Sequence, residues 1–409
     1  MPSRHPIAPA ENHASASASA PEASAKAAPE ASAKAAPEAS AKATPIRDFF
    51  ARAFNTSVLD KNRMAWVDYL RGIAILLVVY RHVLLGIQNS GYELPAAYLN
   101  ANIMFFSFRM PLFFILSGIF ITASLARKSL GRIIYSKFEL LLYPYLIWAT
   151  VQITIQIFAS QYTNANRTAH DYLYIFYQPE KIDQFWYLPA LFNTTIVYLL
   201  TKTKLKLHGW MQLLLGLTLY FLSPLCSSIS MMSNWMEFYI FFAIGDTVSS
   251  LFFRESVQSF LKNRFTFLCL FPVFLATQFY YLHSYIANQG NVPLPLFLPI
   301  ALFGCLTMCT LAYRLQTWNV LRFLRVIGYH SLYIYVIHVI VAACVRVILT
   351  RVFGLHEPLA LLFIGIALAA SIPVMFYNLF VLEKPLFFLF TLRRYPASRQ
   401  KPAAKREAA

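Results

Sequence analysis

The sequence is poor in charged residues and lacks the short motifs of soluble nucleotide-binding and metal-dependent enzymes. Asp, Glu, Lys and Arg make up 13% of its 409 residues, whereas a soluble domain contains about a quarter. It has no Gly-rich phosphate loop, no His-Glu-x-x-His pattern and no Cys-x-x-Cys pair. No apolar segment near the first residues has the features of a cleaved signal peptide, so none is expected. The five cysteines are interpreted as packing residues, and no metal site is predicted.

Long apolar runs are what the chain has instead. Hydrophobic residues make up 58% of it, and apolar windows long enough to cross a ~30 Å hydrocarbon core recur along the sequence. We therefore predict an all-α, polytopic bundle of about ten transmembrane helices. The predicted spans are 65–87, 101–123, 139–159, 184–201, 209–226, 235–253, 265–284, 295–313, 326–349 and 359–382. The shortness of 209–226 and Pro373 inside 359–382 make these the least regular of the ten.

The basic residues alternate between successive connections. Thirteen Lys or Arg residues follow the second, fourth, sixth and eighth predicted spans, and only three lie in the other loops. Because basic loops stay in the cytoplasm, this alternation predicts that both termini are cytoplasmic. The net charge of +17 follows from this topology and a basic C-terminal tail, so no nucleic-acid partner is inferred.

The first part of the chain differs from the rest in composition. The octapeptide PEASAKAA occurs at 21–28 and again at 29–36, and a close copy follows. Such small and polar residues cannot form a core, so we predict a disordered cytoplasmic tail over 1–62. The transmembrane domain is expected at 63–388 and a basic cytoplasmic tail at 389–409.

Ionisable residues inside the predicted spans are the best guide to function, because each one is costly in hydrocarbon. Arg71 and His82 belong to the first span and are eleven residues apart. Eleven residues at 100° each turn the helix about 20° past three full turns, so both side chains share one face. The rise between them is ~16.5 Å. Asp68, one turn before Arg71, is placed to pair with it, although Asp68 at the helix end is also an ordinary interfacial residue.

The second span contains Arg109 at a depth close to that of His82. No acidic residue accompanies Arg109 in its span, so its guanidinium requires an anionic or carbonyl partner. Pro111 is expected to loosen the helix just after it. Ser117 and Gly118 are small enough for close helix contact. Lys137 lies at the predicted cytoplasmic end of the third span.

Two further groups of polar or aromatic residues are candidates. Ser331, Tyr335 and His338 form a polar stripe on the ninth span, where a histidine is also commonly a hydrogen-bonded structural residue. Trp186 and Tyr187 end the longest predicted external loop. They are interpreted either as part of the aromatic belt at the membrane surface or as a stacking platform for a sugar ring.

These residues belong to motifs that resemble those of the acyltransferase 3 family of integral-membrane O-acyltransferases. The similarity spans about 63–388, including the spacing of His82 after Arg71. The motifs are DYLRG at 68–72, RMPLFFILSG at 109–118, SKFELLLYPY at 136–145, WYLPAL at 186–191, GYHSLYIYVIH at 328–338 and EKP at 383–385. Arginine is commoner in the family where Lys137 stands.

The resemblance implies transfer of an acyl group, usually acetyl, from coenzyme A to a carbohydrate hydroxyl. No permanently bound cofactor is expected, and acetyl-CoA is the co-substrate. The expected acceptor is an exopolysaccharide, a lipid-linked oligosaccharide or an O-antigen, and the expected location is the bacterial inner membrane. The family's subset of exopolysaccharide and fucose acetylases is the nearest in size.

The predicted roles combine this resemblance with the helix geometry. His82 is the expected general base and Arg109 the group that stabilises the oxyanion, while Tyr335 and His338 orient the acceptor or relay the proton. Coenzyme A is expected to contact Arg71, Asp68, Lys137 and Ser117. Trp186 and Tyr187 are the expected acceptor contacts. A proton-coupled transporter or flippase would use buried Arg and His residues equally well, although the two halves of the chain show no correspondence.

Overall fold

The computed structural model describes residues 45–59, 64–161 and 166–392. The chain divides into two units, 1–43 and 44–409, and the first lies outside the described residues. The described residues form α-helices with short 3₁₀ and π-helical turns, and they contain no β-strand. The prediction of an all-α bundle is confirmed.

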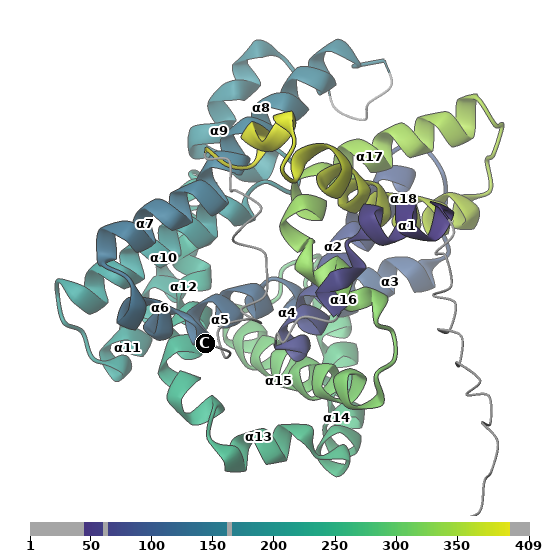
Figure 1. Cartoon of the computed structure of the whole chain (residues 1–409). Helices are drawn as coiled ribbons and strands as arrows, with labels where there is room; N and C mark the ends of the chain where they lie inside the picture. The colour runs from purple at the N-terminus through teal and green to yellow at the C-terminus, as the bar shows by residue number, and fades with distance from the viewer. Residues whose placement is uncertain (1–44, 60–63, 162–165, 393–409) are drawn as a thin grey trace, which may run out of the picture. The chain divides into compact units, whose positions relative to one another are not determined.

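The helices of the second unit follow one another with short connections (Figure 1). In the first half they are α1 Pro45–Phe54, α2 Ala65–Gln88, α3 Ala96–Met104, α4 Phe106–Arg109, α5 Pro111–Ile119, α6 Ile121–Arg127, α7 Leu130–Lys137, α8 Tyr143–Phe158, α9 Tyr174–Tyr177 and α10 Tyr187–Thr203. In the second half they are α11 Gly209–Leu222, α12 Ser230–Phe252, α13 Glu255–Lys262, α14 Arg264–Ala287, α15 Leu294–Trp318, α16 Phe323–Tyr329, α17 Ser331–Arg351 and α18 Pro358–Phe376.

The number of candidate membrane spans is slightly lower than predicted. By length and composition, the described residues contain eight, or nine if α12 and α13, bent by 104°, form one span. The predicted spans 184–201 and 235–253 are the two that are not among the eight. The first corresponds to α10, which has 17 residues, close to the lower limit of ~17 for crossing the hydrocarbon. The second corresponds to α12, the longer part of the bent pair.

Several predicted spans are broken in the structure. The second consists of α3 to α6, and α4 ends at Arg109 while α5 begins at Pro111. Pro111 therefore interrupts the helix where the sequence predicts, because its ring removes a backbone donor. The ninth predicted span divides at His330 into α16 and α17. Pro373 does not end α18, which continues to Phe376 and a π-helical turn.

Two helix pairs cross so closely that only glycine fits at the contact. A Cβ on Gly328 of α16 would lie 1.8 Å from the carbonyl oxygen of Asp68 in α2, and one on Gly72 would lie 2.2 Å from Leu324 O. In the same way, Gly118 of α5 faces the backbone of α12, as expected for a small residue at a membrane-helix interface. The first crossing is important for the site, because α17 follows α16 after a single residue and also packs on α2.

Part of the predicted N-terminal tail is ordered. Residues 45–59 form α1 and a 3₁₀ turn, and Asn378 Nδ2 donates a hydrogen bond to Ala53 O at 3.0 Å. The prediction of disorder over 1–62 is therefore wrong for 45–59. The rest of that prediction, and the predicted tail beyond residue 392, lie outside the described residues.

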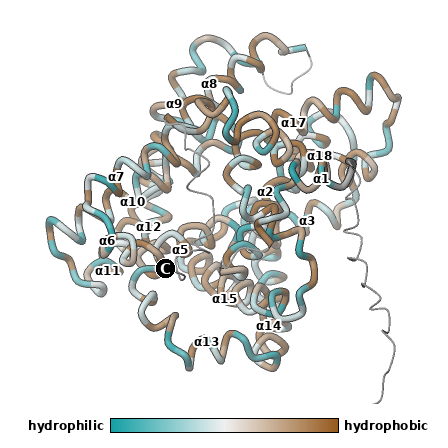
Figure 2. Tube along the Cα trace, in the orientation of Figure 1, coloured by the Kyte–Doolittle hydropathy of each residue, from teal (hydrophilic) through white to brown (hydrophobic). Residues whose placement is uncertain are grey.

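Apolar side chains cover much of the outer surface of the helices. Hydrophobic residues predominate along helices such as α15 and α17 in Figure 2. On α14, Phe265, Leu268 and Phe279 are each about 60% exposed. Exposed apolar surface on this scale is unfavourable in water and favourable in a bilayer, so the helices present the surface of a membrane protein.

Candidate active site

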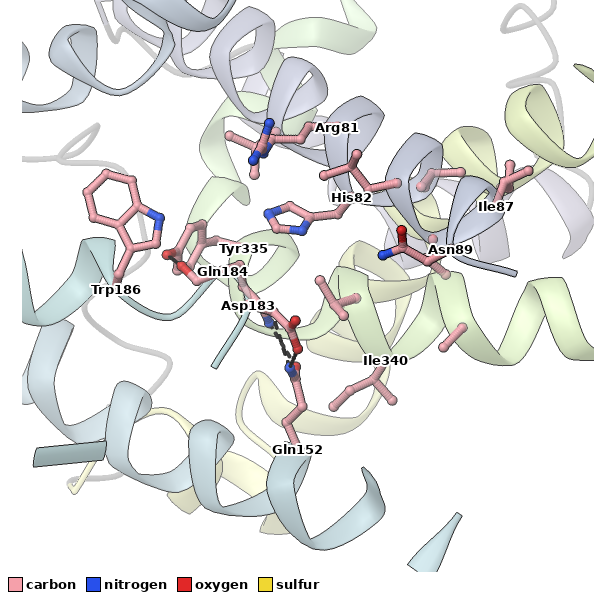
Figure 3. Close-up of a pocket in the computed structure, with 18 of the residues that line it drawn as sticks. Arg81, His82, Ile87, Asn89, Gln152, Asp183, Gln184, Trp186, Tyr335 and Ile340 are labelled. Carbon is pink, nitrogen blue, oxygen red and sulfur yellow. Dashed lines mark hydrogen bonds between the residues drawn. The ribbon is translucent and has the colours of Figure 1, made fainter. Parts of the chain in front are cut away.

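A cavity of about 830 Å³ contains the largest group of predicted site residues. Its walls come from α2, α4, α8, the segment 180–186, α12, α17 and α18, with one residue from α15. His82, Arg109, Trp186 and Tyr335 line it, and Figure 3 shows the His82 ring projecting from α2 toward Tyr335 and Gln184. Residues that lie far apart in the sequence are therefore brought to one space.

His82 is paired with His338 of α17. Their ring centroids are 5.1 Å apart, at an interplanar angle of 66°. His338 Nδ1 lies 3.0 Å from Ile334 O and 2.8 Å from Tyr335 O. Because both neighbours are acceptors, Nδ1 carries the hydrogen, and in neutral imidazole Nε2 is then a proton acceptor. His338 is fully buried, and its Nε2 has no partner among the described residues.

Arg109 is held by fixed partners, and one of its nitrogens has none among the described residues. Its Nη1 donates to Leu77 O at 2.9 Å and to Asn102 Oδ1 at 3.3 Å, and its guanidinium lies over the Phe106 ring. Only 1% of Arg109 is exposed, and Nη2 has no hydrogen-bond partner within the described ranges. A buried guanidinium nitrogen without an acceptor is costly, so the arrangement fits a ligand carbonyl or anion in the cavity.

The aromatic candidates have different surroundings. Trp186 lines the cavity and packs against Phe238, with ring centroids 5.4 Å apart. Tyr187 is buried and does not line the cavity; its ring lies 5.3 Å from that of Tyr335. The Tyr335 hydroxyl donates to the backbone carbonyl of Gln184. Trp186 is thus the residue of this pair that a ligand would contact.

Comparison with protein families identifies the class to which the chain belongs. A family model described as an acyltransferase domain matches residues 64–378. The chain belongs to the acyltransferase 3 family. With its apolar helices, this acyltransferase is a multi-pass membrane protein, and family membership favours acyl transfer over the transporter interpretation. Comparison with curated proteins finds no match, and comparison with solved structures finds none.

The residues predicted to bind coenzyme A lie away from the cavity of this acyltransferase. Asp68, Arg71, Ser117 and Lys137 are all described, and none belongs to the cavity lining. Asp68 lies at the crossing with α16. Arg71 lies near enough to Lys137 for their charges to repel, and near enough to Tyr187 for its charge to act on the phenol. Arg71 thus lies in the neighbourhood of Tyr187, whose ring contacts that of Tyr335.

The sequence interpretation missed a cluster of polar residues on the side of the cavity formed by α8 and the segment 180–186. Gln152 and Gln156 of α8 line it together with Asp183 and Gln184. We call these four residues the glutamine wall. One signal was present in the sequence, because two glutamines one turn apart in an apolar span share a helix face and require partners. The positions of Asp183 and Gln184 depend on the path of a loop and have no periodic signal.

Proposed function

We propose that this acyltransferase moves an acyl group, in particular acetyl, from acyl-CoA on the cytoplasmic side to a hydroxyl of a cell-surface or exported carbohydrate. We place it in a bacterial inner membrane. The observation that carries the proposal is the presence of His82 and Arg109 in the lining of one cavity, with His338 in ring contact with His82, in a member of this family. A base and a carbonyl-binding cation are the two groups that acyl transfer from a thioester requires.

In the proposed reaction His82 is the general base. It accepts the proton of the sugar hydroxyl while the oxygen attacks the thioester carbonyl, which forms a tetrahedral oxyanion. Collapse of this intermediate breaks the carbon–sulfur bond, and the thiolate takes the proton back from His82. The products are the sugar ester and free coenzyme A.

Two neighbours support His82 and the oxyanion. His338 presents a proton-accepting Nε2 without a partner among the described residues, and its ring centroid lies 5.1 Å from that of His82. An N–H of His82 turned toward this atom during the reaction would leave the other His82 nitrogen to accept the proton of the hydroxyl. Arg109 would place its Nη2 hydrogens against the carbonyl oxygen as negative charge develops there. His338 is a positioning residue in this scheme, while His82 and Arg109 are catalytic residues.

The donor would approach from the side of Arg71 and Lys137. The helix α2 is continuous from Ala65 to Gln88, so Arg71 and His82 share a face and are separated by a rise of ~16.5 Å. Charge-assisted hydrogen bonds from Arg71 and Lys137 would hold the phosphates, with Asp68 and Ser117 nearby in the donor site. The thin arm of coenzyme A would carry the thioester toward His82.

The proposal is tested with purified protein in nanodiscs and acetyl-CoA labelled in the acetyl group. Membrane glycans extracted from the host serve as acceptors, and labelled glycan is the readout. His82→Ala is expected to reduce the rate about 10²–10⁴-fold, the usual contribution of a general base. The control is His356→Gln, an exposed histidine whose ring contacts Tyr92. Near-normal transfer by His82→Ala, with correct insertion, would disprove the proposed mechanism.

A further inference from the structure

The glutamine wall is a connected hydrogen-bond network that faces the cavity. Gln152 Nε2 donates to Asp183 Oδ2 at 2.8 Å, and Gln184 Nε2 donates to Gln152 Oε1 at 2.9 Å. Gln156 Nε2 donates to the same Asp183 oxygen at 3.1 Å. Figure 3 shows Gln152, Asp183 and Gln184 grouped on the side of the cavity opposite Arg81. Each amide has two N–H donors and two acceptor sites, so the network retains capacity for a ligand.

A residue outside the cavity lining supports this network from behind. Arg167 Nε donates to Gln156 Oε1 at 3.2 Å, and its guanidinium lies 3.8 Å from Asp183 Oδ2. Its side chain is 11% exposed, whereas that of Asp183 is 36% exposed. Asp183 also has a positive φ of 50°, an uncommon conformation that Asp tolerates better than most residues. The wall is therefore preorganised, and its carboxylate is open to a ligand.

The charges on this side of the cavity are unfavourable for an anionic ligand. Asp183, Glu180 and Glu237 all line the cavity, and the last two are close enough for their charges to interact. The three arginines of the lining are held on other elements: Arg109 Nη1 donates to Leu77 O, Arg346 Nη1 donates to Gly86 O at 2.5 Å, and Arg81 lies opposite Gln152 and Asp183 in Figure 3. Carboxylates would repel the phosphates of coenzyme A. A neutral ligand rich in hydroxyl groups matches amides and carboxylates best.

An aromatic ring completes this surface. Trp186 follows Gln184 by two residues, lines the cavity and rests on Phe238. An aromatic face beside a few placed polar groups is the usual composition of a small-molecule site. A sugar ring offers hydroxyl groups along its edge and C–H groups on its faces, so one ring can use both surfaces together.

We infer that the glutamine wall and Trp186 form the subsite that binds one neutral sugar ring of the acceptor. The inference rests on the proposed function and assigns the acceptor to specific residues. The subsite is joined to the histidines, because the Tyr335 hydroxyl donates to Gln184 O and His338 follows Tyr335 by three residues on α17. A sugar bound here would lie near the His82 ring, which projects toward Tyr335 and Gln184 in Figure 3.

The first test measures binding without turnover. The full-length protein in nanodiscs is examined by saturation-transfer NMR with the methyl glycosides of glucose, galactose, mannose, fucose, rhamnose and N-acetylglucosamine, and with methyl glucuronoside as the anionic control. At least one neutral glycoside is expected to bind, and the glucuronoside is expected to bind more weakly than its neutral glucose counterpart. Absence of binding by all the neutral glycosides, or preference for the glucuronoside, overturns the inference.

The second test compares variants. Gln152→Leu and the milder Asp183→Asn are expected to weaken binding of the best glycoside about tenfold, the effect of one lost hydrogen bond of ~1.4 kcal/mol. The matched control is Gln212→Leu, because Gln212 is equally buried but bonds to Thr201 and Tyr239 outside the cavity lining. Equal binding by Gln152→Leu, Asp183→Asn and Gln212→Leu overturns the inference.

The transfer assay separates this inference from the proposed function. In acetyl transfer to the best glycoside, Gln152→Leu is expected to raise the KM for the glycoside about tenfold and to leave that for acetyl-CoA within twofold. A rise in the KM for acetyl-CoA alone would assign the wall to the donor and overturn the inference. If the glycoside binds through the wall but no acetyl is transferred to it or to any glycan, the proposed function fails while the sugar subsite stands.

Discussion

The two sides of the cavity are held in place in different ways. The histidine wall, which we define as His82 in the lining and His338 in contact with it, is positioned mainly by backbone: α2 and α16 touch at Gly72 and Gly328, and His338 Nδ1 bonds to two carbonyls. The glutamine wall is positioned by side chains, with Gln152 as its centre. Backbone contacts leave few alternative arrangements, whereas a side-chain network changes with each substitution.

This difference suggests that the histidine wall serves the chemical step and the glutamine wall serves recognition of the acceptor. The chemistry of acyl transfer is the same for any hydroxyl, so its residues benefit from a fixed scaffold. Acceptors differ in the arrangement of their hydroxyls, so a recognition surface benefits from being adjustable. We therefore expect substitutions in the histidine wall to reduce kcat, and those in the glutamine wall to raise the KM for the acceptor.

Replacement of Arg109 by glutamine is expected to lower kcat about 10²–10³-fold, because the developing oxyanion loses its charged donor. Thermal unfolding should change less, since Gln retains a polar group for Leu77 O and Asn102. Steady-state acetyl transfer measures the effect, with Arg351→Gln at the end of α17 as the control. A normal kcat in Arg109→Gln would remove Arg109 from the mechanism.

Replacement of Gly328 by alanine tests the backbone scaffold. The added Cβ would lie 1.8 Å from Asp68 O, so α2 and α16 must separate, at a cost of about 2–3 kcal/mol. We expect a lower Tm and a matching loss of activity, measured by thermal unfolding in detergent. The control is Gly131→Ala of α7, where an added Cβ has no heavy atom within 4 Å. Equal Tm values for the two variants would argue against a fixed histidine wall.

Replacement of His338 is expected to separate positioning from simple packing. His338→Leu should reduce kcat about 10–100-fold, as losses of orienting groups commonly do. His338→Gln should recover most of this activity, because its side-chain oxygen is an acceptor near the position of Nε2. If Leu and Gln behave alike in the transfer assay, His338 is a packing residue only.

Replacement of Tyr335 by phenylalanine has the smallest expected effect and tests the link between the walls. It removes the hydrogen bond to Gln184 O and retains the ring contact with Tyr187. We expect a decrease of about tenfold in kcat/KM for the acceptor. The same measurement on Tyr80→Phe, whose hydroxyl bonds to Tyr98 O, is the control. A loss confined to kcat would assign Tyr335 to the histidine wall alone.

The sequence predicted the parts of the site that depend on position along a helix. The shared face of Arg71 and His82 follows from α2 being one continuous helix, and the similar depth of His82 and Arg109 agrees with their common cavity. Residues three apart, such as Tyr335 and His338, are neighbours on any helix. Helical periodicity and hydropathy were sufficient for these assignments, and for the all-α fold.

Tertiary packing determined what the sequence could not supply. Periodicity does not state which helix faces which, so the contact of His82 with His338 was not specifically predicted. Asp183 enters the cavity through a left-handed turn in a loop, which has no repeating pattern. The break at His330 lies inside a predicted span, and the helical periodicity on either side of it does not indicate that the helix divides there.

The size of the cavity affects how much of the acyl donor is hydrolysed instead of being transferred to the acceptor. Its volume of about 830 Å³ far exceeds the ~30 Å³ that one water molecule occupies in the liquid. A histidine able to activate a sugar hydroxyl is also able to activate water, so an acyl donor that arrives before the acceptor is exposed to wasteful hydrolysis. A well-fitting sugar would protect the thioester by displacing that water. Loosening the glutamine wall should therefore shift the enzyme from transferase toward thioesterase.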